Sequence, residues 1–209
     1  MEILLMKVSD KLTWLELEGY LGCLSAAKRR AIMKKKSDGD RINALLSQLL
    51  VLSELARRTG MPLRKIRFEL GTHGKPYLKD SEAQFSLSHT GGAICAAFSD
   101  KDEIGVDIER KDRRVNENMY KRVLSEEEMF HLTSGADFLR FWVQKEAFLK
   151  RLGIGITRDL RGVNSLELPD TAVTEQDGYF IGASGKGAKD AAVRRITVDE
   201  VLARYVLEV

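Results

Sequence analysis

Two acidic residues separated by a single position are the first candidates for chemistry in this chain. Apolar and polar positions alternate across residues 104–109 (IGVDIE), as they do in a β-strand with one buried face. Asp107 and Glu109 would then share a face and lie about 7 Å apart along the strand. Two carboxylates this close repel each other unless a cation neutralises them. Mg²⁺ is bound by one or two carboxylates together with substrate phosphates, so a magnesium site is one interpretation and a solvated strand edge is the other.

A second group of candidates lies on a helix expected at residues 137–152. Apolar residues recur there at helical spacing, and Lys145 falls in the middle of the apolar stripe. A charge at that position is costly unless it has a partner. Glu146 lies at the margin of the stripe, with Lys150 one turn later on the same side. An outward-pointing Lys145 and an ordinary surface pair between Glu146 and Lys150 are the alternative.

Two shorter runs carry residues that suit phosphate binding. The turn at residues 74–77 (GKPY) presents Lys75 on a restrained backbone. The strand expected at residues 85–88 is followed by His89, beside Ser88 and a glycine pair that predicts a hairpin turn. A hydrolytic Ser–His pair is disfavoured, because neighbouring strand residues point to opposite faces and the G-x-S-x-G motif is absent. A purely structural hydrogen bond is the alternative role for His89.

Helices and strands must together position these side chains. The polar run at residues 100–103 divides the chain into two halves, residues 1–101 and 102–209, and each half contains a long helix and several short strands. The expected class is therefore α+β, with each long helix packed on a small antiparallel sheet. Helices are expected at 21–36, 41–58, 125–133 and 137–152, and strands at 1–8, 66–70, 76–78, 85–88, 93–99, 104–109, 163–168, 178–182 and 204–208. The glycine-rich run 182–187 lacks the spacing of a phosphate loop and is expected to be a hairpin tip.

Composition restricts the classes of function. The chain has 209 residues, with 34 Lys and Arg against 31 Asp and Glu, and a net charge of +3 that argues against a nucleic-acid coat. Cys23 and Cys95 are far apart and outside any C-x-x-C pair, so neither a disulfide framework nor a zinc site is expected. The opening residues do not resemble a signal peptide, and no run approaches the roughly 18 apolar residues of a membrane span. We expect a cytoplasmic protein that does not bind membranes.

The chemistry-bearing runs, taken in this order, resemble the Sfp-type 4′-phosphopantetheinyl transferases. The matching runs are GKP at 74–76, FSLSH at 85–89, GVDIE at 105–109 and WVQKEAFLKRLGIG at 142–155. The resemblance implies a monomer of two pseudo-symmetric halves with coenzyme A bound in the cleft between them. It also implies transfer of the 4′-phosphopantetheine arm of coenzyme A to a serine of an apo carrier protein, with release of adenosine 3′,5′-bisphosphate.

The resemblance also implies roles for individual residues. Asp107, Glu109 and Glu146 are expected to hold Mg²⁺, and Glu128 matches a further acid near the metal. Glu146 is a candidate base, and Lys150 is expected to contact the phosphates beside Asp107. The positions expected to bind coenzyme A are Lys28, Arg41, Lys75, Pro76, Ser88, His89, Lys145 and Lys150.

The chain departs from the family pattern at three places. Asn43 stands where some relatives place a phosphate-binding arginine, and Arg41 is expected to replace it. Ala31 occupies the position of a second lysine near Lys28, and residues 123–124 (VL) replace an aromatic pair. These changes concern contacts with the adenosine end of coenzyme A.

Two other functions fit part of the pattern. A Mg²⁺-dependent nuclease or phosphodiesterase would also use acids and a lysine, but it gives no reason for the Ser-Leu-Ser-His strand. A non-catalytic coenzyme A-binding protein would not need the full set of acids. The basic helix around residues 28–36 is a solvated face, a contact for coenzyme A or an acidic carrier protein, or, least favoured by the net charge, a nucleic-acid contact.

Overall fold

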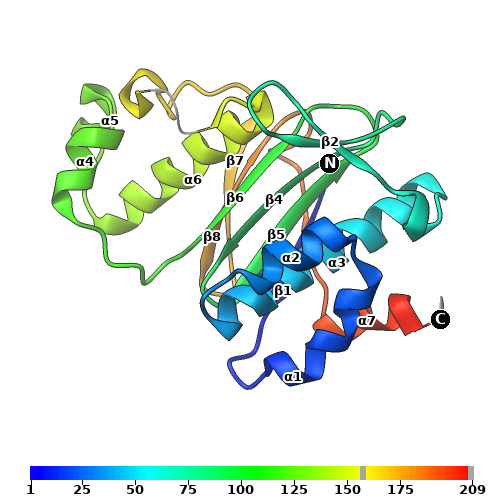
Figure 1. Ribbon diagram of the computed structural model, residues 1–209. Coiled ribbons are helices and arrows are strands. Elements are labelled where there is room, and N and C mark those ends of the chain that lie inside the picture. Colours follow the sequence, from blue (N-terminus) through cyan, green and yellow to red (C-terminus); the bar gives the residue numbers. More distant parts are fainter. Residues whose placement is uncertain (156–158, 207–209) are drawn as a thin grey trace.

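The computed structural model describes residues 1–155 and 159–206, and the α+β class expected from the sequence is confirmed (Figure 1). The strands are β1 (Glu2–Lys7), β2 (Phe68–Leu70), β3 (Pro76–Leu78), β4 (Gln84–Thr90), β5 (Ala93–Ser99), β6 (Gly105–Arg110), β7 (Thr171–Gln176), β8 (Tyr179–Ser184) and β9 (Val193–Arg195). The helices are α1 (Trp14–Leu17), α2 (Ala26–Met33), α3 (Asp38–Thr59), α4 (Glu117–Val123), α5 (Glu126–Phe130), α6 (Gly135–Leu152) and α7 (Val198–Val206). No helix within the described ranges is both long and apolar enough to cross a bilayer.

The strands form two main sheets and a small hairpin. The first sheet has the order β4-β5-β1-β9 and the second has the order β6-β8-β7, while β2 and β3 pair separately. Neighbouring strands are antiparallel except β1 and β9, which run parallel. Thr90 pairs with Ala93 across residues 91–92, so the predicted Gly-Gly hairpin turn is confirmed.

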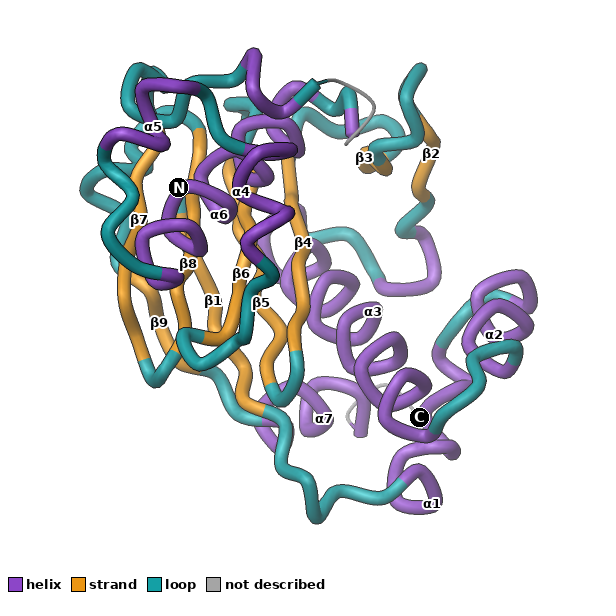
Figure 2. The backbone as a smooth tube through the Cα atoms, turned by 90° about the vertical axis from the view of Figure 1, so that its left-hand side faces the viewer, coloured by secondary structure: helices purple, strands orange, loops and turns teal. Residues whose placement is uncertain are grey.

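Three hydrophobic cores divide the molecule into layers. One core lies between the two main sheets, where Leu5 and Cys95 of the first sheet meet Val106 and Ile181 of the second. A second core lies between the other face of the first sheet and the helices α1, α2, α3 and α7, and the third lies between the second sheet and the helices α4 and α6. In Figure 1 the strands lie between α6 and α3, and Figure 2 shows α3 beside the edge of the sheet at β4. The alternation of β6 therefore leaves its polar face toward α6.

The two long helices begin and end at the residues that sequence rules favour. Ser37 caps α3 by accepting a hydrogen bond from the amide of Asp40, and Gly60 ends it in the left-handed conformation. Ser134 caps α6 in the same way, and Gly153 ends it with φ +70°. Left-handed backbone is costly for residues with a Cβ, which explains both terminal glycines.

Two of the expected strands are wrong. Residues 163–168 form turns instead of a strand, because the Asn164 side chain accepts a hydrogen bond from the amide of Leu166 and Ser165 bonds to Glu128. Residues 204–206 belong to α7, and residues 207–209 lie outside the described residues. A capping box between Thr197 and Glu200 starts that helix.

The expected hairpin tip at residues 182–187 is also wrong, because Gly182 lies inside β8 and the chain after β8 crosses to β9, which pairs with β1 of the other sheet. The helix expected at 21–36 is confirmed only in its centre, since α2 spans Ala26–Met33 and residues 18–23 form a 3₁₀-helix.

The C-terminal segment returns to the first half of the chain. Strand β9 pairs with β1, with Ile3 opposite Val193, and α7 packs on α3. Arg204 of α7 donates a 3.0 Å hydrogen bond to the fully buried Glu54, which also pairs with Arg57 and Arg58. Three arginines thus surround one buried carboxylate. The division into halves at residues 101 and 102 stays a prediction.

Candidate active site

Two glycines let α6 lie directly on the second sheet. A Cβ at Gly105 would lie 1.9 Å from the carbonyl oxygen of Ala147, and one at Gly182 would lie 2.1 Å from that of Val143. Neither separation is sterically possible, so any larger residue would push the helix away. This close contact places Glu146 of α6 beside Asp107 of β6.

The acids of β6 are both buried and both occupied. Asp107 is 6% exposed, and its Oδ1 accepts hydrogen bonds from the Ser88 hydroxyl at 2.6 Å and the Lys150 ammonium at 2.7 Å. Glu109 is 9% exposed and accepts a 2.7 Å hydrogen bond from the Thr90 hydroxyl. Alternate side chains of β4 (positions 88 and 90) therefore contact alternate side chains of β6 (positions 107 and 109).

Glu146 has an electrostatic environment that calls for a proton or a cation. Its Oε1 is buried and has no hydrogen-bond partner. Burial, and next the nearby charge of Asp107, raise the pKa of Glu146 to about 7, although Lys150 acts in the opposite direction. An unpartnered carboxylate oxygen beside a second carboxylate is unfavourable without a positive group between them.

The fit of these acids to a divalent cation follows from that environment. In residues 1–155 and 159–206, no three His, Cys, Asp or Glu side chains are arranged to hold a metal ion as they stand. The donor chemistry nevertheless suits Mg²⁺, which prefers carboxylate oxygens, and the partnerless oxygen of Glu146 supplies an available ligand. The residues therefore fit such an ion if the Lys150 ammonium leaves Asp107 or shares that carboxylate with the ion.

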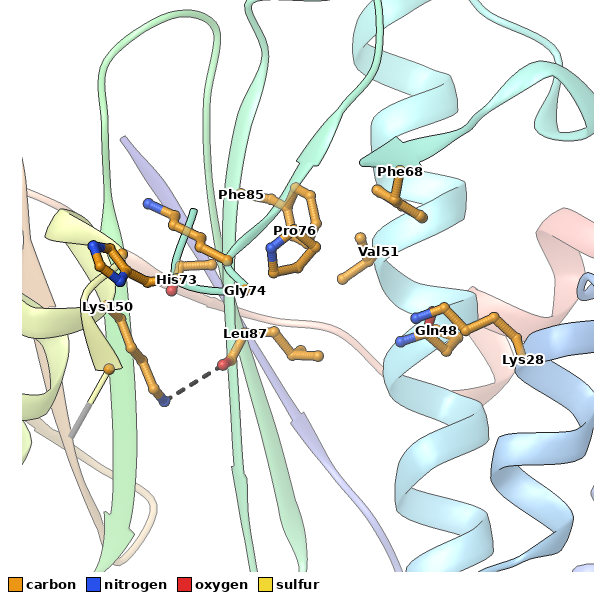
Figure 3. Close-up of a pocket in the computed structure, with 14 residues that line it drawn as sticks. Lys28, Gln48, Val51, Phe68, His73, Gly74, Pro76, Phe85, Leu87 and Lys150 are labelled. Carbon is orange, nitrogen blue, oxygen red and sulfur yellow. Dashed lines mark hydrogen bonds between the residues drawn. The ribbon is translucent and has the colours of Figure 1, made fainter. Parts of the chain in front are cut away.

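A cavity of about 330 Å³ opens beside these residues (Figure 3). Lys150 lies at one end of it, and its ammonium also donates a 3.4 Å hydrogen bond to the carbonyl of Leu87. Lys28 and Gln48 lie at the opposite end, on α2 and α3. The remaining lining residues are Val51, Phe68, His73, Gly74, Lys75, Pro76, Phe85, Ser86, Leu87, Gly153 and Gly155. The cavity thus has an apolar wall and lysines at both ends.

The Gly-Lys-Pro turn contributes to this cavity as the sequence suggests. Lys75 and Pro76 both line it, and the Lys75 ammonium donates to the carbonyl oxygens of Ile104 at 3.1 Å and Arg151 at 2.9 Å. Burial lowers the pKa of Lys75. These bonds join the turn to the end of α6 and fix the cavity wall.

Four of the predicted coenzyme A-binding residues do not line the cavity. Ser88 is turned toward Asp107, and His89 is exposed at the end of β4. Arg41 forms a 2.8 Å ion pair with Asp38 on its own helix. Lys145 is the fourth; it is fully buried, and unlike Lys150 on the same helix it does not line the cavity.

Lys145 is held by the fold itself. Its ammonium donates to Glu128 at 2.5 Å and to the carbonyl oxygens of Val123 and Leu160 at 2.6 and 2.9 Å. Glu128 is also buried, and it accepts further hydrogen bonds from the amides of Ser125 and Ser165. The pair therefore anchors α5 and the 160s segment to α6, and it accounts for the charge within the apolar stripe.

Several residues that shape the site were absent from the sequence-based set. Thr90 and Arg113 both bind Glu109, and Gln48, Phe68 and His73 line the cavity. Thr90 could have been found from the matching alternation of β4 and β6. The cavity residues depend on contacts between distant segments, which local patterns do not reveal.

Comparison with known proteins gives matches over both halves of the chain. Residues 103–206 match the 4′-phosphopantetheinyl transferase superfamily, and residues 13–101 match the family described as 4′-phosphopantetheinyl transferase, N-terminal. The chain is 31% identical to 4′-phosphopantetheinyl transferase Sfp of Bacillus subtilis over 172 residues, which cover 75% of this chain and 76% of that protein.

A fungal protein has nearly the same sequence identity to this chain. The chain is 30% identical to the L-aminoadipate-semialdehyde dehydrogenase-phosphopantetheinyl transferase of Saccharomyces cerevisiae over 168 residues. The matched region covers 73% of this chain but 60% of the yeast protein.

Proposed function

The chain belongs to the 4′-phosphopantetheinyl transferase superfamily, and we propose that it transfers the 4′-phosphopantetheine arm of coenzyme A to a serine of an apo carrier protein. Adenosine 3′,5′-bisphosphate is the other product. The position of Asp107, Glu146 and Lys150 at the end of a lysine-bearing cavity carries this proposal. Such an arrangement supplies a proton acceptor and positive charge where a phosphoryl group would react.

Coenzyme A would lie along the cavity with its pyrophosphate at the Lys150 end. The described residues that line the cavity include Lys28, Lys75 and Lys150 and no acid, so a ligand with several phosphates is favoured. Phe68 and Pro76 supply an apolar wall that suits the adenine ring. Lys75 would act near the 3′-phosphate, although its ammonium must first leave two backbone carbonyls.

The reaction forms a bond between the serine oxygen and the β-phosphorus and breaks the bond from that phosphorus to the bridging oxygen. Glu146 would accept the serine proton, because its carboxylate lies beside Asp107 and the phosphate-binding Lys150. Lys150 would stabilise the negative charge on the departing bisphosphate. Asp107, Glu109 and Glu146 would hold Mg²⁺, which when bound would neutralise charge on the pyrophosphate.

Mass spectrometry tests the proposal directly. The protein is incubated with coenzyme A, Mg²⁺ and an apo carrier protein, and the carrier should gain the mass of one phosphopantetheine arm. Glu146→Gln and Lys150→Met should abolish the gain, whereas Glu167→Gln, a change at an exposed acid, should retain it. Binding of coenzyme A without any mass gain would favour a non-catalytic protein, and cleavage of coenzyme A or nucleic acid without transfer would favour a phosphodiesterase.

We also propose that the protein is a cytoplasmic monomer that acts on an acidic carrier without binding nucleic acid or membrane. The exposed basic face of α2, which includes Arg29 and Arg30, supports an acidic partner, because opposite charges accelerate encounter. Sedimentation of the purified protein would test the monomer. Transfer that slows steeply with salt would support the electrostatic encounter.

A further inference from the structure

Glu109 has both of its carboxylate oxygens occupied. Its Oε1 accepts hydrogen bonds from the Thr90 hydroxyl at 2.7 Å and from the amide of Arg110 at 2.9 Å. Its Oε2 forms an ion pair with the guanidinium of Arg113. The side chain is only 11% exposed, so a ligand that binds Glu109 must displace one of these groups.

Arg113 reaches this position from the turn after β6. Its amide donates a 3.2 Å hydrogen bond to the carbonyl of Arg110, which keeps the turn close to the strand. Its guanidinium carbon lies 5.8 Å from the ring centre of Trp142 on α6, within the range of a cation–π contact. The cation therefore spans β6 and α6 on the face that carries Glu109.

Two side-chain cations stand on the two acids of β6. Lys150 contacts Asp107, and Arg113 contacts Glu109. Their roles differ, because Lys150 lines the cavity whereas Arg113 does not. Each acid of β6 is therefore neutralised by a side chain of the protein itself.

Building on the proposed magnesium site, we propose that Arg113 is an internal competitor of the divalent cation at Glu109. Glu109 would release the guanidinium from Oε2 in order to bind the ion, while Thr90 and the Arg110 amide would retain Oε1 and keep the carboxylate oriented. Metal binding is then an exchange of one cation for another, and its affinity is lower than that of a carboxylate without a counterion. Arg113 thereby sets the Mg²⁺ concentration that the site requires.

Calorimetric titration with MgCl₂ or MnCl₂ alone, without coenzyme A, tests this exchange. Arg113→Ala should bind the metal about fivefold more tightly than the unchanged protein, the typical effect of losing a partly exposed ion pair. Arg114→Ala is the matched control, because it removes the same charge from the adjacent exposed position and has no contact with Glu109. A similar gain in metal affinity in both variants would mean that the effect comes from net charge alone, and it would overturn the proposal.

A second measurement follows the guanidinium itself. The Arg113 Nε–Hε resonance should shift as Mg²⁺ saturates the unchanged protein, because the ion pair is broken, and Arg113→Lys should retain most of the competition. A resonance that stays fixed up to saturation would contradict the exchange. Active transfer with equal metal affinity in Arg113→Ala would refute this inference alone, whereas the absence of both metal binding and transfer would refute the proposed function with it.

Discussion

The substitution Glu146→Gln should stabilise the metal-free protein at alkaline pH while abolishing transfer. Burial and the neighbouring Asp107 raise the pKa of the Glu146 carboxyl from an ordinary 4.5 to about 7. At about 1.4 kcal/mol for each pH unit, the charged carboxylate lowers the free energy of unfolding by roughly 3 kcal/mol above pH 7. Glutamine keeps the shape of the side chain and removes this charge.

The sign of the pH dependence follows from proton binding. Between pH 4.5 and 7 the folded protein retains a proton on Glu146 that the unfolded chain has lost, so stability due to this group falls as the pH rises through that window. Below pH 4.5 both states are protonated, and Glu146→Gln should have little effect. The variant should therefore gain its full advantage at pH 8.

Urea denaturation in EDTA, repeated from pH 5 to pH 8.5, measures this difference. The free energy of unfolding should fall with pH in the unchanged protein and in the control Glu167→Gln, and it should fall less in Glu146→Gln. Mg²⁺ at pH 8 should stabilise the unchanged protein more than the variant, because the ion neutralises the carboxylate. Equal pH profiles for Glu146→Gln and the unchanged protein would refute the reasoning.

Three other changes have definite expected outcomes. Gly105→Ala should lower the free energy of unfolding by about 3 kcal/mol or more, because its Cβ would meet the Ala147 carbonyl. Gly39→Ala in α3 should be tolerated and serves as the control. Thermal melts compare the two variants, and equal melting temperatures would contradict the close packing of α6 on Gly105. Lys145→Met should lower the free energy of unfolding by roughly 3–5 kcal/mol, because it leaves Glu128 buried without its partner. Adding Glu128→Leu to this variant should restore much of the lost stability in urea titrations. A double variant no more stable than Lys145→Met would contradict the pairing. Lys28→Ala should raise KM for coenzyme A about tenfold, with a smaller change in kcat. Arg29→Ala, which lies outside the cavity, should leave KM unchanged. An unchanged KM in Lys28→Ala would show that Lys28 does not bind coenzyme A.

The local patterns predicted which of the candidate side chains share a face, while their roles stay predictions. Alternation along residues 104–109 placed Asp107 and Glu109 on one face, and the helical stripe placed Lys150 one turn after Glu146. These relations depend only on backbone periodicity, which tertiary contacts rarely overturn in strongly patterned elements. The turn before β3 was found for a similar reason, because glycine and proline restrict the backbone locally.

Partners could not be predicted where they come from distant segments. The stripe showed that Lys145 needed a counter-charge, but Glu128 is supplied by another helix that only the tertiary fold brings near. Arg41 is a different case, because Asp38 lies three positions earlier on the same helix and the pair could have been expected from helical spacing. Asparagine and serine at positions 164 and 165 overrode an apolar pattern by bonding to nearby groups.

The pairing of β9 with β1 also matters during synthesis on the ribosome. Residues 2–7 emerge before residues 8–192, whereas the strand at residues 193–195 that pairs with them emerges after that whole stretch. The growing polypeptide must therefore carry an open sheet edge at β1 until β9 has emerged, and such edges favour unwanted association with other chains. Arg204 of α7, which follows β9 in the chain, then supplies a cation to the buried Glu54 of α3.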